Sequence, residues 1–104
     1  MAGDGELNSP SEWLARHTSH APPVLRERVL ACAGGSPATP VALASAARRA
    51  LARVLASPGD RAAALDLLAA DGLITLALLA QAETDPAALG AFAASLLDGE
   101  RTGD

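Results

Sequence analysis

Apolar residues in this chain recur at spacings of three and four, in segments separated by proline, glycine, serine and aspartate. Such spacing puts the apolar side chains on one face of an α-helix, which that helix then buries. In residues 40–56 an apolar row stands opposite a polar row: Leu43, Ala47, Ala50, Leu51 and Val54 against Ser45, Arg49 and Arg53. Residues 23–33 are predicted to bury Leu25, Val29 and Cys32 and to turn Arg26, Glu27 and Arg28 largely outward. Residues 86–98 are predicted to bury Leu89, Phe92, Ala93 and Leu96.

Proline and capping residues mark where these helices begin and end. Ser9-Pro10, followed by Glu12, has the form of a capping box with proline at the first helical position. Thr39-Pro40 and Asp85-Pro86 are further starts of the same kind, and Asp60 is a candidate cap for one more helix. Prolines and glycines end the helices. The predicted helices run from Pro10 to before Pro22, from Pro23 to Gly34, from Pro40 to Ser57, from Asp60 to about Glu83, and from Pro86 to Asp98-Gly99.

Composition supports helices and argues against a sheet. Alanine and leucine dominate the 104 residues, and only Trp13 and Phe92 are aromatic. Alanine and leucine lose little side-chain entropy in a helix, whereas strands favour β-branched and aromatic residues. We therefore predict an all-α fold, a compact bundle of about five helices with a central apolar helix at about 60–83. Residues 9–98 form its single domain, and residues 1–8 and 99–104 are flexible tails.

The predicted central helix is apolar on almost every side. Two rows of leucines and isoleucine are expected to face neighbouring helices: Leu65, Leu68, Leu76 and Leu79, and Leu67, Ile74 and Leu78. Asp66 and Asp71 argue against a membrane span because each costs about 2.5–3.5 kcal/mol near a bilayer centre. Each aspartate is expected to lie at a gap between neighbours or to pair with Arg61 or another helix. Gly72 could mark a kink, a break or a close crossing, and we favour a continuous helix.

The segment "LLAADGLITLALLAQA" resembles a helix of the trans-prenyl diphosphate synthases, which are all-α bundles. The resemblance covers about a sixth of the chain. The aspartate-rich DDxxD motifs that bind magnesium in that family are absent, and the chain is far too short for such an enzyme. Asp66 and Asp71 are separated by about 140° around a helix, so that helix alone cannot bring both to one ion. The synthase activity is therefore not expected here.

Charge and cysteine content indicate which classes of function and which cellular compartment to expect. The net charge of −4 argues against a nucleic-acid-binding protein, although the middle of the chain is basic and the ends are acidic. Every basic residue is arginine, which together with the alanine and glycine content is typical of a GC-rich bacterial genome. Cys32 is the only cysteine, so no internal disulfide can form. The first ten residues lack a signal-peptide pattern, and we expect a cytoplasmic protein.

Candidate chemistry is sparse. His17 and His20 could share a helix face, but two ligands and a lone thiol fall short of a metal site. Cys32 lies on an apolar face, where thiols are usually inert. The segment "AGGSPATP" lacks the GK[ST] of a phosphate-binding loop. We therefore expect no catalytic residues, no cofactor and no enzymatic activity.

What remains is a set of candidate contact surfaces. Trp13 and Leu14 are expected to close one end of the bundle or to anchor a partner. Small residues on the last helix would allow another helix to approach closely. We predict a small interaction, accessory or oligomerisation module that binds a protein partner or itself, with no role at a membrane. The alternative is a binder of an acyl or isoprenoid chain between helices. The candidate interface residues are Trp13, Leu14, Arg48, Arg49, Arg53, Leu89, Gly90, Ala91, Phe92 and Ala94.

Overall fold

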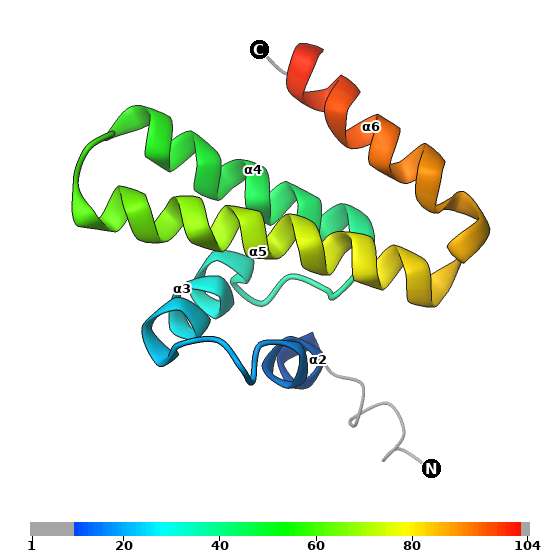
Figure 1. Ribbon diagram of the computed structural model, residues 1–104, viewed down its shortest axis with the longest axis horizontal. Helices are drawn as coiled ribbons and strands as arrows, with labels where there is room; N and C mark the ends of the chain where they lie inside the picture. The colour runs from blue at the N-terminus through cyan, green and yellow to red at the C-terminus, as the bar shows by residue number, and fades with distance from the viewer. Residues whose placement is uncertain (1–9, 103–104) are drawn as a thin grey trace.

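The computed structural model describes the chain from residue 10 to residue 102, and the side-chain packing of residues 12–98. Helices account for the regular structure in that range, which contains no strand, so the predicted all-α fold is confirmed (Figure 1). The elements are α2 (Pro10–His17), α3 (Pro23–Ala33), α4 (Pro40–Ala56), α5 (Arg61–Thr84), the 3-10 turn η1 (Pro86–Ala88) and α6 (Leu89–Thr102). The expected N-terminal tail, residues 1–8, and the Ser9 cap lie outside the described residues.

The two longest helices begin at the caps that the sequence predicts. The Thr39 hydroxyl accepts a hydrogen bond from the backbone N–H of Ala42 at 3.3 Å. The Asp60 carboxylate accepts one from the backbone N–H of Ala63 at 2.7 Å. Each cap satisfies one of the backbone donors that a helix leaves unpaired at its start. The starts of α4 and α5 are therefore confirmed at the level of single hydrogen bonds.

The end of α3 is also set by a local signal. Gly34 adopts a left-handed conformation with φ of 56°, and its N–H bonds the Leu30 carbonyl at 3.0 Å. This is the helix ending that glycine favours, because a side chain would be strained at positive φ. The predicted stop at Gly34 is confirmed.

Two predicted helix ends were wrong. The first helix, α2, ends at His17 and not just before Pro22. The Thr18 hydroxyl donates to the Leu14 carbonyl at 2.8 Å, and the residue before Pro22 is disfavoured in a helical conformation. The last helix passes through Gly99 and reaches Thr102, where the sequence predicted an end at Asp98-Gly99. A single glycine weakens a helix without necessarily ending it.

The connection before the last helix also differs from the prediction. Pro86 opens the short turn η1, and α6 follows only from Leu89. Asp85 makes no side-chain capping hydrogen bond, so the predicted cap at this position does not form. The 3-10 turn redirects the chain after α5, and α6 leaves the end of α5 at an angle (Figure 1).

The core lies between α4 and α5, which are antiparallel neighbours, with α3 packed on α5 (Figure 1). Leu43 and Leu73 are its largest fully buried side chains. Around them the core is mostly alanine, which lets helix axes approach closely. The buried alanines on these two helices are Ala44, Ala46, Ala47, Ala50, Ala63, Ala69, Ala70, Ala77 and Ala80. The inward row predicted for residues 40–56 is thereby confirmed at Leu43, Ala47 and Ala50.

Helix α5 is central and continuous through Gly72, as predicted, but it is not covered on every side. Leu67 and Leu68 are 51% and 53% exposed, although the sequence places both in rows that face neighbouring helices. Leu67 lies on the side of α5 from which α6 diverges (Figure 1). Leu68 lies on another side, beside Leu25 and Val29 of α3, where the neighbouring segments leave it half covered.

Candidate functional site

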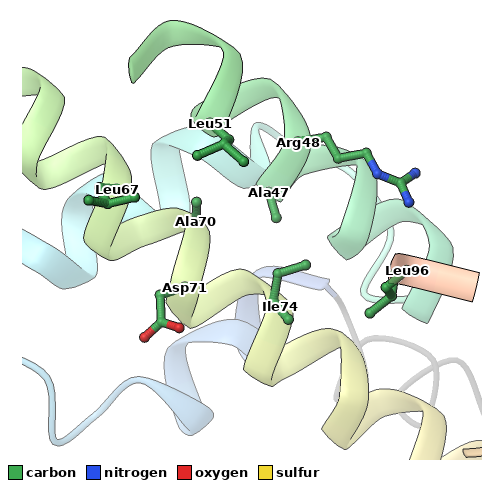
Figure 2. A pocket seen from close by; sticks show the side chains of 8 residues that line it. All are labelled: Ala47, Arg48, Leu51, Leu67, Ala70, Asp71, Ile74 and Leu96. Carbon is green, nitrogen blue, oxygen red and sulfur yellow. The ribbon is translucent and has the colours of Figure 1, made fainter. Parts of the chain in front are cut away.

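A groove runs between α4, α5 and α6, and Figure 2 shows the side chains that line it. Its volume is about 200 Å³. The lining residues are Ala47, Arg48 and Leu51 of α4, Leu67, Ala70, Asp71 and Ile74 of α5, and Leu96 of α6. We call this the α4–α5–α6 groove. Six of its eight lining residues are apolar, so its surface attracts apolar groups out of water.

The groove owes its shape to small residues on the two long helices. Ala47 and Ala70 are 2% and 6% exposed and contribute little bulk. Leu67, Ile74 and Leu96 stand around them and form the apolar walls (Figure 2). Small residues flanked by large ones leave a hollow that side chains of another helix can fill.

An apolar side chain remains exposed in the wall of the groove. Leu67 lines the groove and is 51% exposed. Exposed apolar patches on small proteins often mark interaction sites. The groove is therefore the strongest candidate contact surface in the described residues.

Two opposite charges stand at the rim of the groove. Arg48 on α4 and Asp71 on α5 are both exposed and point away from one another on opposite sides of the apolar floor (Figure 2). Within residues 12–98 neither side chain takes part in an ion pair. Both charges are consequently available to a molecule bound in the groove.

A second polar feature is the buried carboxylate of Asp66 on α5. Its side chain is 7% exposed. Arg28 Nη1 lies 3.3 Å from Asp66 Oδ1, and Arg53 Nε lies 3.5 Å from Asp66 Oδ2. Arg28 belongs to α3 and Arg53 to α4, so the carboxylate connects three helices. The prediction that the aspartate pairs with another helix is confirmed. Arg53 is exposed, as its outward placement predicts, and Arg28 is partly exposed, while the guanidinium groups of both reach the buried carboxylate. Both arginines lie beside a cavity of about 370 Å³ and remain partly solvated.

Cys32 lies against this ion-pair cluster. Its sulfur accepts a hydrogen bond from Arg53 Nη2 at 2.9 Å and lies 3.8 Å from Asp66 Oδ1. Burial raises the pKa of the Cys32 thiol, with a smaller contribution from the Asp66 charge, and the two arginines oppose the shift. Since the thiolate is the nucleophile, this thiol is poorly suited to catalysis at neutral pH.

Trp13 and Leu14 attach α2 to the rest of the bundle. Leu14 is 3% exposed and belongs to the core, so its side chain is not available to a partner. The Trp13 indole N–H donates to Glu83 at the end of α5, at 3.1 Å, and the ring lies 4.5 Å from that of His17. His17 also lies 3.8 Å from Glu83. Trp13 therefore fastens α2 to the bundle, as expected for a residue that closes its end.

The other predicted interface residues do not form one surface. Arg48 lines the groove, Arg49 is exposed on α4, and Arg53 points to Asp66. On α6, Leu89 and Phe92 are half-buried, whereas Gly90, Ala91 and Ala94 are exposed. The groove residues of α5 were not among the predicted interface residues. Their signal was the lack of a polar face on α5, which we interpreted as complete burial.

The described residues contain no cluster suited to a metal ion and one helix of membrane-like composition. Within the described part of the chain, no three histidine, cysteine, aspartate or glutamate side chains come close enough to hold a metal ion. In the same range one helix, α5, is long and apolar enough to cross a bilayer by length and composition. Of its 18-residue apolar window, 39% is buried inside the protein.

The chain matches no known family model, and neither the curated proteins nor the solved structures contain a significant match. The chain is therefore described by its own fold and groove. It is an all-α bundle in which α3, α4 and α5 pack together, α2 is attached beside them, and α6 is set at an angle beside an open apolar groove.

Proposed function

We propose that this protein is a small non-enzymatic interaction module that binds a helix of a protein partner in the α4–α5–α6 groove. The single observation that carries the proposal is the open apolar groove with a half-exposed Leu67 in its wall. A partner that covers this leucine gains the free energy of removing its side chain from water. The expected gain is about 1 kcal/mol for this residue, from a total of 1.5–3 kcal/mol for full burial.

The shape of the groove favours a helix over other ligands. Leu67, Ala70, Asp71 and Ile74 follow the spacing of one helical face, and α4 runs alongside them. Two adjacent helices form an elongated trough whose ridges and hollows suit a third helix. Apolar residues at spacings of three and four on the partner would enter between Leu67 and Ile74.

An acyl or isoprenoid chain is a poorer fit. Ligand pockets of drug-like size usually measure about 300–1,000 Å³, and the groove measures about 200 Å³. A lipid bilayer is a poorer fit for another reason, because Arg48 and Asp71 would be carried into contact with the acyl chains. A protein surface can offer a counter-charge to each of them.

The proposal is tested by site-directed photo-cross-linking in the cell. A photo-reactive amino acid replaces Leu67 in one variant and Leu55 in a control variant. Leu55 is 75% exposed on the same pair of helices but does not line the groove. We expect irradiation to yield a protein adduct of defined mass from position 67 and much less from position 55.

The alternatives give different results in this experiment. Equal adducts from both positions would mean contact without a specific site and would overturn the proposal. Adducts with lipid alone at position 67, together with flotation of the wild-type protein on phospholipid vesicles, would replace it with a membrane-binding function.

A further inference from the structure

We infer that the helix bound in the α4–α5–α6 groove is α5 of a second copy of this chain, an inference that rests on the function proposed above. The argument comes from the charges at the rim. The groove carries one positive side chain, Arg48, on its α4 side and one negative side chain, Asp71, on its α5 side. A surface with a positive and a negative margin around an apolar floor is complementary to itself.

Symmetry decides how two such grooves fit together. In a two-fold dimer the same patch is used by both copies, so each contact occurs twice. An axis along the groove places Arg48 of each copy opposite Asp71 of the other. An axis across the groove would place Arg48 opposite Arg48 and Asp71 opposite Asp71, which is repulsive. The charges therefore select the first arrangement, in which the α5 helices of the two copies run parallel.

The apolar residues add the driving force that these exposed charges lack. Pairs of exposed charges contribute little affinity by themselves, although they select partner and orientation. In the parallel arrangement the half-exposed Leu67 of each copy moves from water to the apolar floor of the other. Apolar burial would then hold the dimer together, and Arg48 and Asp71 would set its geometry.

The experiment is a charge exchange measured by sedimentation velocity on the full chain. Wild type, Arg48→Glu, Asp71→Arg and the double exchange are compared at low salt, where rim charges are least screened. The concentration range extends from about 1 μM to about 1 mM so that weak dimers are detected. Arg49→Glu is the matched control, because Arg49 is exposed on α4 beside Arg48 but does not line the groove.

We expect the wild type to dimerise and each single exchange to weaken the dimer by about tenfold or more, since two contacts become repulsive in each. The double exchange should restore most of the affinity, and Arg49→Glu should change it little. Single exchanges without effect, or a double exchange that restores nothing, would overturn this arrangement.

The outcome also separates this inference from the proposed function. A wild type that stays monomeric at every concentration overturns the second copy as occupant. The cross-link from position 67 then decides the proposed function independently: an adduct with another protein keeps it, and the absence of any protein adduct ends it. An adduct of twice the chain mass of 10.4 kDa supports both statements.

Discussion

At the scale of single residues, Asp66 shows how this protein accommodates a charge in its most apolar helix. The carboxylate is buried, yet two guanidinium groups from two other helices reach it. Burying an ion pair contributes little net stability, but leaving one partner alone is costly. The side chains of Arg28 and Arg53 remain 32% and 49% exposed, so water still solvates both guanidinium groups and their desolvation penalty is reduced.

Replacing Asp66 with asparagine should therefore destabilise the fold. The change removes the negative charge but keeps the shape, and it replaces one acceptor oxygen with an amide NH2 donor that faces the guanidinium donors. We expect a loss of about 1–3 kcal/mol in the free energy of unfolding, measured by urea denaturation. Asp71→Asn is the matched control on the same helix, and both variants are measured at low protein concentration, where the groove is unoccupied. Because Asp71 is exposed and has no ion pair in residues 12–98, that change should stay within about 0.5 kcal/mol. Equal losses in both variants would contradict the role assigned to Asp66.

Cys32 provides a prediction for alkaline pH. Burial raises the pKa of its thiol above the ordinary 9.0. Below pH 9.0 the thiol is neutral in both the folded and the unfolded chain, and above it the unfolded chain ionises first. The free energy of unfolding should therefore fall as pH rises from 9.0 toward the pKa of the folded state.

This chain is well suited to that measurement because it contains no tyrosine and no lysine, so Cys32 is its only side chain expected to titrate in this range. Urea denaturation at pH 8 and at about pH 10 is compared for wild type and Cys32→Ser. The wild type should lose stability between the two pH values, and the serine variant should lose less. An identical loss in both would exclude Cys32 as the cause.

At the scale of elements, the continuity of α5 through Gly72 is the feature that the sequence left most open. A Cβ at Gly72 would meet Val29 Cγ2 at 3.8 Å, an ordinary van der Waals distance. The glycine is therefore not required by a close crossing with α3, and it only weakens the helix.

Gly72→Ala should stabilise the protein by about 0.5–1 kcal/mol, because alanine loses less backbone freedom on folding. Thermal denaturation followed by circular dichroism should show a rise of several degrees in Tm. Gly34→Ala is the contrasting variant: Gly34 has φ of 56°, and a Cβ there lies 3.4 Å from the Ala31 carbonyl oxygen. It should lower Tm. A lower Tm for Gly72→Ala would mean that α3 and α5 cannot make room for the methyl group.

At the scale of the whole molecule, the open side of α5 determines whether association, and with it the apparent stability, depends on protein concentration. Three helices pack well, but α6 turns away and leaves the α4–α5–α6 groove accessible (Figures 1 and 2). Any partner that binds only the folded state raises the apparent stability by mass action.

If a second copy occupies the groove, Tm of the wild type should rise with protein concentration. Leu67→Asp should remove this dependence and leave Tm at low concentration nearly unchanged, because Leu67 is already half exposed. Leu55→Asp is the control at an exposed leucine outside the groove. A concentration dependence that survives Leu67→Asp but is lost in Leu55→Asp would place the contact elsewhere on the surface.

The sequence by itself determined the class of fold and most helix boundaries. The signals at Thr39, Asp60 and Gly34 act over three or four residues, through one backbone hydrogen bond each. Such local interactions can be predicted from the sequence without knowing how the helices pack. The exceptions are the helix ends at Thr18 and at Gly99, where weak local preferences compete, and the start at Pro86, where the Asp85 side chain does not form the predicted cap.

Only the tertiary structure decided which polar groups meet and which apolar surface stays open. Arg28 and Arg53 lie 38 and 13 residues from Asp66, and no spacing rule links positions on different helices. The α4–α5–α6 groove depends on the direction that α6 takes after η1. That direction follows from a 3-10 turn at Pro86–Ala88, where proline predicted a helix start but not its angle. Burial depends on the angles between helices, and these angles arise from packing across the whole molecule.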